Sequence, residues 1–260
     1  MYREQKDPFQ EHRKWNTDKI LAEKGILVAC DITQEWILPW WWDHYQKTNQ
    51  YPVCFIDLGM SKPKKSWCQE RGIYRALRTP DPFVAEKSEV NSDRIQDWEG
   101  HYGKSFWLNR NAWFKKPLAC LLTAFEKTIW LDIDCKVQGS LEPLFSLSDT
   151  SAGFSIAKEN RSVGDCPIFN SGVMVFKRML PLIEEWANLA YFENHAYAGD
   201  QDVLSFLIKE RKIAFHELPQ TYNWSRCNRE NPQAQILHLH GLYGKTVIAH
   251  EIMRSTLESR

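Results

Sequence analysis

The sequence predicts an α/β protein in which a mixed central sheet is flanked by helices. Short apolar runs of strand length alternate with longer segments of helical spacing through the first half of the chain. Apolar residues make up 43% of the 260 residues, which is enough for a sizeable core. No low-complexity linker divides the sequence. We therefore expect one domain over residues 25–260, preceded by a charged extension over residues 1–24.

The first half of the chain gives three strands and one clear helix. Residues 25–31, "GILVACD", form an apolar run opened by a glycine, and residues 51–59, "YPVCFIDLG", form a second run that a Ser-Lys-Pro turn follows. A third strand is expected within residues 71–80. Between the first two strands, residues 34–49 predict a helix with Pro39 tolerated in its first turn. The charged segment that follows, residues 80–100, predicts loop with short helices.

The second half of the chain predicts more strands and helices in mixed order. A helix over residues 109–126 precedes an apolar strand over residues 128–131, and further strands are expected at residues 151–159 and 171–177. The remaining expected helices cover residues 180–192, 200–211 and 247–258, and the tail also carries the apolar segments 212–219 and 234–241.

Composition and charge indicate which kinds of molecule the protein binds and in which cellular compartment it is found. The formal net charge is +0, which disfavours nucleic acid as a partner. The N-terminal residues are polar, and the longest apolar runs are too short to span a bilayer, so we expect a soluble, cytoplasmic protein with no transmembrane segment. Peripheral attachment to a membrane surface stays open. Seven scattered cysteines without a CxxC pair favour reduced, buried thiols over a zinc finger.

Two aspartates end the strand over residues 128–131 and need partners, because a buried carboxylate must be paired, hydrogen-bonded or bound to a metal. Asp132 and Asp134 are two residues apart, so they point the same way if the chain stays extended. Asp31 ends the first strand, and ligands of open α/β sheets bind beyond the carboxyl ends of strands. Carboxylate oxygens suit Mg²⁺ or Mn²⁺. An isolated Asp-x-Asp motif is also compatible with an ordinary surface turn.

Five segments in order resemble one family of enzymes. They are "ILVACDITQEW" (26–36), "KKPLACLLTAFEKTIWLDID" (115–134), "IFNSGVMVFK" (168–177), "GDQDVLSFL" (199–207) and "ILHLHGLYGK" (236–245). Together they resemble the nucleotide-sugar glycosyltransferases of the GT-A fold that carry a DxD motif. The likeness is to the glycogenin-like, family 8 retaining enzymes and to related α-mannosyltransferases. The resemblance implies a Rossmann-like nucleotide-diphospho-sugar transferase domain.

The resemblance also implies roles for particular residues. Asp132, Asp134 and His238 would hold Mn²⁺ or Mg²⁺ against the diphosphate of the donor, with His240 as a rival to His238. Three residues at the start of the expected helix 200–211 would contact donor or acceptor and carry catalytic roles: Asp200, Gln201 and Asp202. The donor-binding set that the family implies is Ala29, Asp31, Thr33, Lys116, Asp132, Asn170, Ser171, Gly172, Gly241 and Lys245.

Some of these residues have ordinary structural alternatives. Asp200 is a good helix cap, Asp202 suits a first helical turn, and Asp31 could cap the following helix. Lys245 departs from the family pattern, because three residues separate it from Gly241 where the family usually has two. Its phosphate role is therefore open.

The implied function is transfer of a hexose from a nucleotide diphosphate sugar, UDP-linked by family tendency, to an acceptor hydroxyl with retention. The acceptor could be a carbohydrate, a glycolipid or a protein. Two alternatives remain at this point. One is a DxD phosphohydrolase or phosphotransferase, although Lys136 occupies the position where those enzymes usually have Thr or Val. The other is a carbohydrate-binding protein that has lost catalysis.

Overall fold

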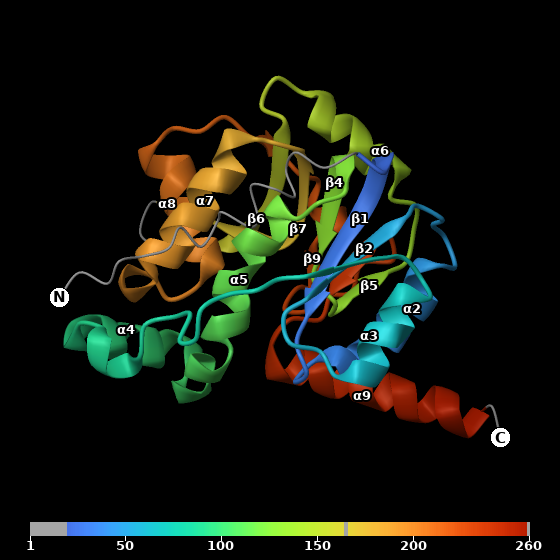
Figure 1. The fold of residues 1–260 in the computed structure, drawn as a ribbon, viewed down its shortest axis with the longest axis horizontal. Coiled ribbons are helices and arrows are strands. Elements are labelled where there is room, and N and C mark those ends of the chain that lie inside the picture. Colours follow the sequence, from blue (N-terminus) through green and yellow to red (C-terminus); the bar gives the residue numbers. More distant parts are fainter. Residues whose placement is uncertain (1–19, 164–165, 259–260) are drawn as a thin grey trace.

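The structure, a computed structural model, describes residues 20–163 and 166–258. Within these ranges the central sheet has the strand order β3-β2-β1-β4-β7-β6-β8 (Figure 1). Strands β1, β2, β3 and β4 run parallel, whereas β7 runs antiparallel to both β4 and β6. The sheet is mixed, as predicted. Its strands are β1 (Ala22–Cys30), β2 (Val53–Asp57), β3 (Ile73–Ala76), β4 (Phe125–Leu131), β6 (Phe154–Val163), β7 (Cys166–Lys177) and β8 (His216–Glu217).

Helices cover both faces of the sheet, and successive side chains of each strand serve opposite faces. One core lies between the sheet and α5, α7 and α8; a second lies between the sheet and α2, α3, α6 and α9 (Figure 1). In β1, for example, Leu27 belongs to the first core, and Ile26 and Val28 belong to the second. The helices are α2 (Leu38–Tyr45), α3 (Lys62–Gln69), α5 (Arg110–Leu121), α6 (Glu142–Phe145), α7 (Pro181–Phe192), α8 (Asp200–Glu210) and α9 (Gly241–Glu258).

A small second sheet joins distant parts of the sequence and was not predicted as a unit. Its order is β5-β10-β9, with β5 (Cys135–Val137) directly after the aspartate pair and β10 (Ile236–His238) near the end of the chain. Strand β10 runs antiparallel to β5 and parallel to β9 (Trp224–Ser225). These strands are two or three residues long, so the alternation of apolar and polar residues is too short to reveal them in the sequence.

Helix α4 (Ser92–Tyr102) and the 3-10 turn after it form a small aromatic core of their own. Arg110 is fully buried at the boundary of this region, and its guanidinium lies over the rings of Trp98, Trp107 and Phe114. The guanidinium donates hydrogen bonds to four backbone carbonyls, those of Ala85, Asn194, Tyr197 and Ala198. One side chain of α5 therefore fixes the loop that leads into α8.

The predicted boundaries differ from the observed ones in a few places. The expected helix 109–126 ends at Leu121, because the chain must turn before β4 begins at Phe125. The last helix starts at Gly241, six residues earlier than expected. Most of the expected extension, residues 1–19, lies outside the described residues, and the segment 22–24 already belongs to β1.

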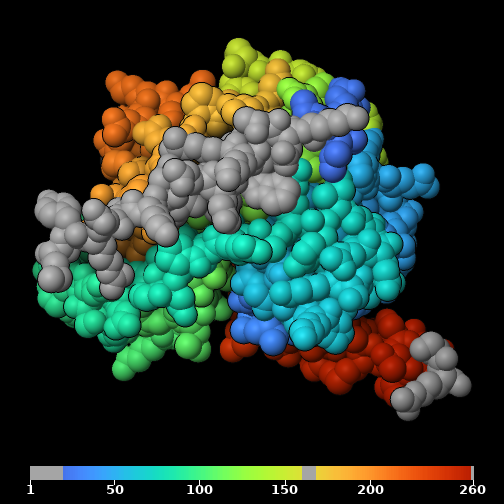
Figure 2. All heavy atoms as spheres, viewed as in Figure 1, coloured from blue at the N-terminus to red at the C-terminus, as the bar shows by residue number. Residues whose placement is uncertain are grey.

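The surface of the described part shows two further features. Helix α9 projects at the lower right in the space-filling view, where its C-terminal half stands out from the rest of the molecule (Figure 2). Among the residues described, no helix combines the length and the apolar character needed to cross a bilayer. The described cysteines are free thiols; Cys227 is exposed, and the buried ones are Cys30, Cys54, Cys68, Cys120 and Cys135.

Candidate active site

The aspartate pair lies in a tight turn between β4 and β5, at the carboxyl edge of the parallel strands. The Asp132 amide donates to the Gly172 carbonyl of β7 at 2.8 Å, and the Asp132 carbonyl accepts from the Cys135 amide at 3.0 Å. Ile133, between the two acids, is buried in the core. The turn is thus anchored at its middle residue and at both of its ends, and this fixes the positions of both carboxylates.

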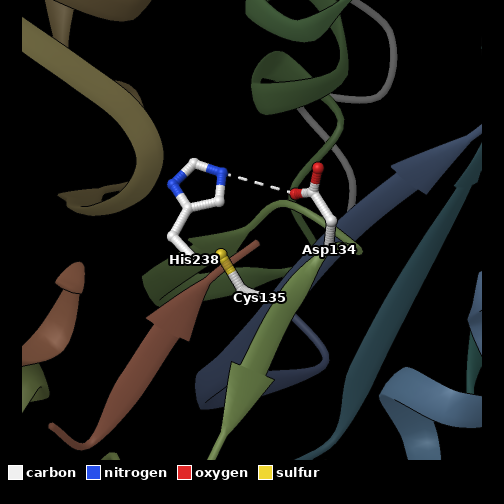
Figure 3. A group of neighbouring side chains, drawn as sticks. All are labelled: Asp134, Cys135 and His238. Atoms are coloured by element: carbon white, nitrogen blue, oxygen red, sulfur yellow. Dashed lines mark ion pairs between the residues drawn. The ribbon is translucent and has the colours of Figure 1, made fainter. Parts of the chain in front are cut away.

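His238 reaches the aspartates because β10 pairs with β5. The pairing places His238 opposite Cys135, and the Leu239 amide donates to the Asp134 carbonyl at 2.9 Å. His238 Nε2 lies 3.3 Å from Asp134 Oδ1 and 3.9 Å from Asp132 Oδ2. Figure 3 shows the imidazole ring and the Asp134 carboxylate facing each other. The sequence-based choice of His238 agrees with this geometry, whereas the Nε2 atom of its rival His240 lies 2.7 Å from the Ser225 hydroxyl.

Gly172 is needed where the histidine ring lies against β7. A Cβ atom at this position would lie 2.1 Å from His238 Cε1 and 2.5 Å from His238 Nδ1. Real Cβ atoms do not approach ring atoms so closely, so any side chain here would displace the imidazole. Gly172, which the family resemblance assigns to donor binding, therefore also makes room for a protein side chain.

Lys116 joins the aspartate pair to the start of α8. Its Nζ lies 3.0 Å from Asp132 Oδ1, 3.4 Å from Asp200 Oδ2 and 3.0 Å from the Ser171 hydroxyl. That hydroxyl in turn donates to Asp200 Oδ2 at 2.7 Å. Burial alone would lower the pKa of Lys116, but the Asp132 and Asp200 carboxylates raise it above its ordinary value, so the ammonium stays charged. Lys116 is committed to protein carboxylates in this structure.

The first turn of α8 divides its three polar residues between different tasks. Asp200 is buried against Lys116, and Asp202 Oδ2 accepts a hydrogen bond from the Gly199 amide at 2.9 Å, which caps the helix. Gln201 is half-buried, and no hydrogen bond of its side chain is found within the described residues. Its amide is therefore available to a ligand.

The surroundings shift the pKa values of the two aspartates in opposite directions. Burial raises the pKa of Asp132, and the nearby Asp134 charge adds to this against the opposing effect of Lys116. For Asp134, burial acts in the same direction, but His238 and Lys245 outweigh it and lower the pKa to about 2. Asp134 is therefore ionised at neutral pH, beside the half-buried Asp132.

The distances between these side chains fit a divalent ion. Adjacent ligands of an octahedral ion with bonds of about 2.1 Å lie about 3 Å apart. Asp134 Oδ1 and His238 Nε2 are 3.3 Å apart, so a cation fits between them with little movement. Asp132 Oδ2 lies 3.9 Å from Nε2 and would have to move closer, and the Asp132 carboxylate also pairs with Lys116. Oxygen and imidazole ligands suit Mn²⁺.

Cys135 belongs to the same cluster but has the wrong chemistry for such an ion. Its Sγ lies near the ligand atoms of Asp134 and His238, and 3.7 Å from the Gly172 carbonyl (Figure 3). Burial and the neighbouring carboxylates raise the pKa of its thiol well above the ordinary value. A protonated thiol does not bind metal, and hard cations prefer oxygen.

Other predicted residues lie at the same edge of the sheet, without a recorded contact to the aspartates. Asp31 Oδ1 accepts hydrogen bonds from the Thr33 amide and hydroxyl at 2.9 and 2.6 Å, so it caps the turn after β1. Ala29 is half-buried in β1. Gly241, with φ +76°, begins α9. The half-buried Lys245 lies close enough to lower the pKa of Asp134.

Three residues at the site were missed in the sequence. Trp130 donates its indole N–H to Asp132 Oδ1 at 2.8 Å, and its spacing of two residues along a strand could have indicated this. Arg226 donates through its backbone amide to the His238 carbonyl at 3.1 Å, and through its side chain to the His240 carbonyl. Asn223 contacts His238 Nδ1 at 2.9 Å. Neither of the latter two belongs to an element long enough to leave a periodic pattern.

No family model and no curated protein matches this sequence. Several solved structures, however, match the fold of this chain. Mouse xyloside xylosyltransferase 1 matches with a TM-score of 0.54 and 15% identity, over 84% of this chain and 97% of that chain. An active-site mutant of LgtC matches with a TM-score of 0.54 and 14% identity, over 87% of this chain and 95% of that one. The chain has the GT-A fold.

A third structure, the glycosyltransferase GlyE of Streptococcus pneumoniae, matches this GT-A chain with a TM-score of 0.55 and 16% identity. The match covers 84% of this chain and 55% of GlyE. The predicted fold class is confirmed, while at these identities the likeness concerns the fold and leaves the chemistry to be argued from the site.

Proposed function

We propose that this chain is a divalent-metal-dependent glycosyltransferase that moves a hexose from a UDP-linked sugar to an acceptor hydroxyl, with retention of configuration. The observation that carries the proposal is the convergence of Asp132, Asp134 and His238 at the carboxyl edge of the sheet of a GT-A fold. The acceptor class, whether carbohydrate, glycolipid or protein, stays open, as does the proposed cytoplasmic location.

The site residues suit this chemistry. A bound Mn²⁺ would stabilise the charge that develops on the leaving diphosphate. Lys245 lies close enough to lower the pKa of Asp134, and this nearby positive charge supports its proposed phosphate role. Gln201 offers an amide, able to donate and to accept, at the buried end of α8, where the donor sugar is expected. The proposed donor-binding residues Asn170, Ser171 and Gly172 lie on β7, which is joined to the start of α8 by the hydrogen bond from Ser171 to Asp200.

The printed names of the similar structures guide the choice of substrates. One neighbour is a xyloside xylosyltransferase, and another structure is the galactosyltransferase LgtC with donor and acceptor sugar analogues. We therefore place UDP-xylose, UDP-galactose and UDP-glucose first in a donor panel.

The test is a Mn²⁺-dependent assay of UDP release with that panel and simple glycoside acceptors. We expect turnover that requires Mn²⁺ and falls at least about 100-fold in Asp134→Asn, because a ligand and its charge are lost. Asp149→Asn, at an exposed ion pair with Lys127, is the matched control and should leave the rate unchanged. Cys135→Ser should also retain activity, because the thiol is no ligand.

The alternative functions give different results in the same assay. Hydrolysis of a generic phosphate ester without any sugar nucleotide would favour a phosphohydrolase. Binding of glycosides without UDP release from any donor would indicate a carbohydrate-binding protein. Either result would contradict the proposal.

A further inference from the structure

A continuous run of hydrogen bonds leads from the backbone of β7 to the ring of His238. The Gly172 amide donates to Asn170 Oδ1 at 2.9 Å, and the Asn223 side-chain amide donates to the same oxygen at 3.0 Å. Asn223 Oδ1 lies 2.9 Å from His238 Nδ1. The residues are buried, with exposed fractions of 9% for Asn170, 8% for Asn223 and 4% for His238.

The direction of every bond in this run follows from its first member. A backbone N–H can only donate, so the atom of Asn170 that meets Gly172 is the carbonyl oxygen. That oxygen then requires a donor from Asn223, which is its NH₂ group, and the Asn223 oxygen must face His238. An amide oxygen can only accept, so Nδ1 carries the proton.

A second contact supports the same orientation of Asn170. Its Nδ2 donates to Glu159 Oε1 at 2.8 Å, so the reversed amide would place two oxygens against each other. The backbone amide of Asn223 is held by the Gln220 carbonyl at 2.9 Å, immediately before β9 pairs with β10. The Asn223 side chain is therefore fixed at both its backbone and its amide.

We propose that Asn223 is a positioning residue that keeps the proton of His238 on Nδ1, so that Nε2 is the ring nitrogen left to bind a divalent cation beside Asp134. The metal half of this inference rests on the proposed function. Outer-shell partners of this kind orient a metal-binding imidazole and raise its basicity. The Asn223 side chain bonds to His238 and to Asn170, so the His238 ring signals and the Mn²⁺ affinity are the readouts that report on its contact with the imidazole.

The tautomer is tested first, without any metal. Long-range ¹H–¹⁵N NMR on histidine-labelled protein distinguishes the two ring nitrogens, and it is run at pH 8.5, where an ordinary imidazole is neutral. We expect a protonated Nδ1 for His238, with the signals assigned through His238→Gln. An unprotonated Nδ1 in the wild type would overturn the proposal, and this measurement needs no Asn223 variant to fold.

Metal affinity is tested second, by Mn²⁺ electron paramagnetic resonance on the full chain. Asn223→Ala removes the acceptor for Nδ1–H, and we expect Mn²⁺ binding about 10- to 100-fold weaker than in the wild type. Asn231→Ala is the matched control, because Asn231 lies in the same loop region and, among the described residues, its Oδ1 accepts a local bond from the Gln233 amide. Its affinity should stay within about twofold, the scatter of such titrations.

The two proposals fail in different ways. A wild type with protonated Nδ1 that binds no Mn²⁺ would overturn the proposed function. A wild type that binds Mn²⁺ while Asn223→Ala, folded by circular dichroism, binds it equally well would overturn the role of Asn223. Loss of the Nδ1–H signal together with weaker binding in Asn223→Ala would support both.

Discussion

At the scale of single residues, the site depends on a glycine, because the absence of a side chain at Gly172 leaves space for the His238 ring. Gly172 lets the His238 ring lie directly on β7, and the same glycine supplies the amide that orients Asn170. A residue with no side chain thus determines both the position of the imidazole and the direction of the hydrogen bonds behind it.

We expect Gly172→Ala to destabilise the protein by about 1 to 3 kcal/mol and to abolish Mn²⁺ binding, because the new methyl group would overlap the imidazole. Urea unfolding and Mn²⁺ titration check this. Gly100→Ala is the control, because a Cβ at Gly100 in α4 meets no atom within 4 Å. It should be neutral or stabilising by up to about 1 kcal/mol. Unchanged metal affinity in Gly172→Ala would contradict the contact with His238.

At the scale of elements, the start of α8 is held by another helix. Arg110 of α5 donates to the Asn194, Tyr197 and Ala198 carbonyls in the loop ahead of Asp200. Burial lowers the pKa of this guanidinium to about 10, a cost that the carbonyl contacts offset. The placement of Asp200 and Gln201 therefore depends on a residue outside the active site.

Arg110→Lys tests that dependence. An ammonium cannot reproduce the planar set of donors, so at least one buried carbonyl loses its partner at a cost of about 1 to 3 kcal/mol. Chemical unfolding should show this loss, and hydrogen exchange of amides 194–202 should become faster. Arg211→Lys, at an exposed ion pair with Glu185, should change stability by less than about 0.5 kcal/mol. Equal exchange in the two variants would show that α8 is positioned by other contacts.

At the scale of the whole molecule, a metal would connect the main sheet to the small one. Asp132 follows β4, whereas His238 ends β10, so a cation bound by both would connect the two sheets.

We expect saturating Mg²⁺ to slow hydrogen exchange in β5 and β10, and to stabilise the fold by about 2.7 kcal/mol at 100 times its Kd. Mass spectrometry and thermal unfolding measure these effects. Asp134→Asn should remove them, and equal protection in both proteins would argue against a site shared by the two sheets.

The sequence predicted the parts of the fold that have long patterns. Residues 25–31 and 128–131 are apolar runs that end at polar residues. Their alternation with helical segments was sufficient to predict an α/β fold with a mixed sheet. The third proposed ligand, His238, came from the resemblance of residues 236–245 to a family motif. Its neighbours Asn223 and Cys135 were not predicted as partners, because strands of two or three residues carry no period, and because their pairing is decided by tertiary contacts.

The pairing of β10 with β5 has a consequence for how the protein is made. A nascent chain that has reached β7 already holds both aspartates and the glycine, yet it cannot bind the ion through an imidazole until residue 238 has emerged from the ribosome. Catalytic competence would therefore arrive late in synthesis, and fragments cut short before β10 would carry the acids without being able to act on a donor.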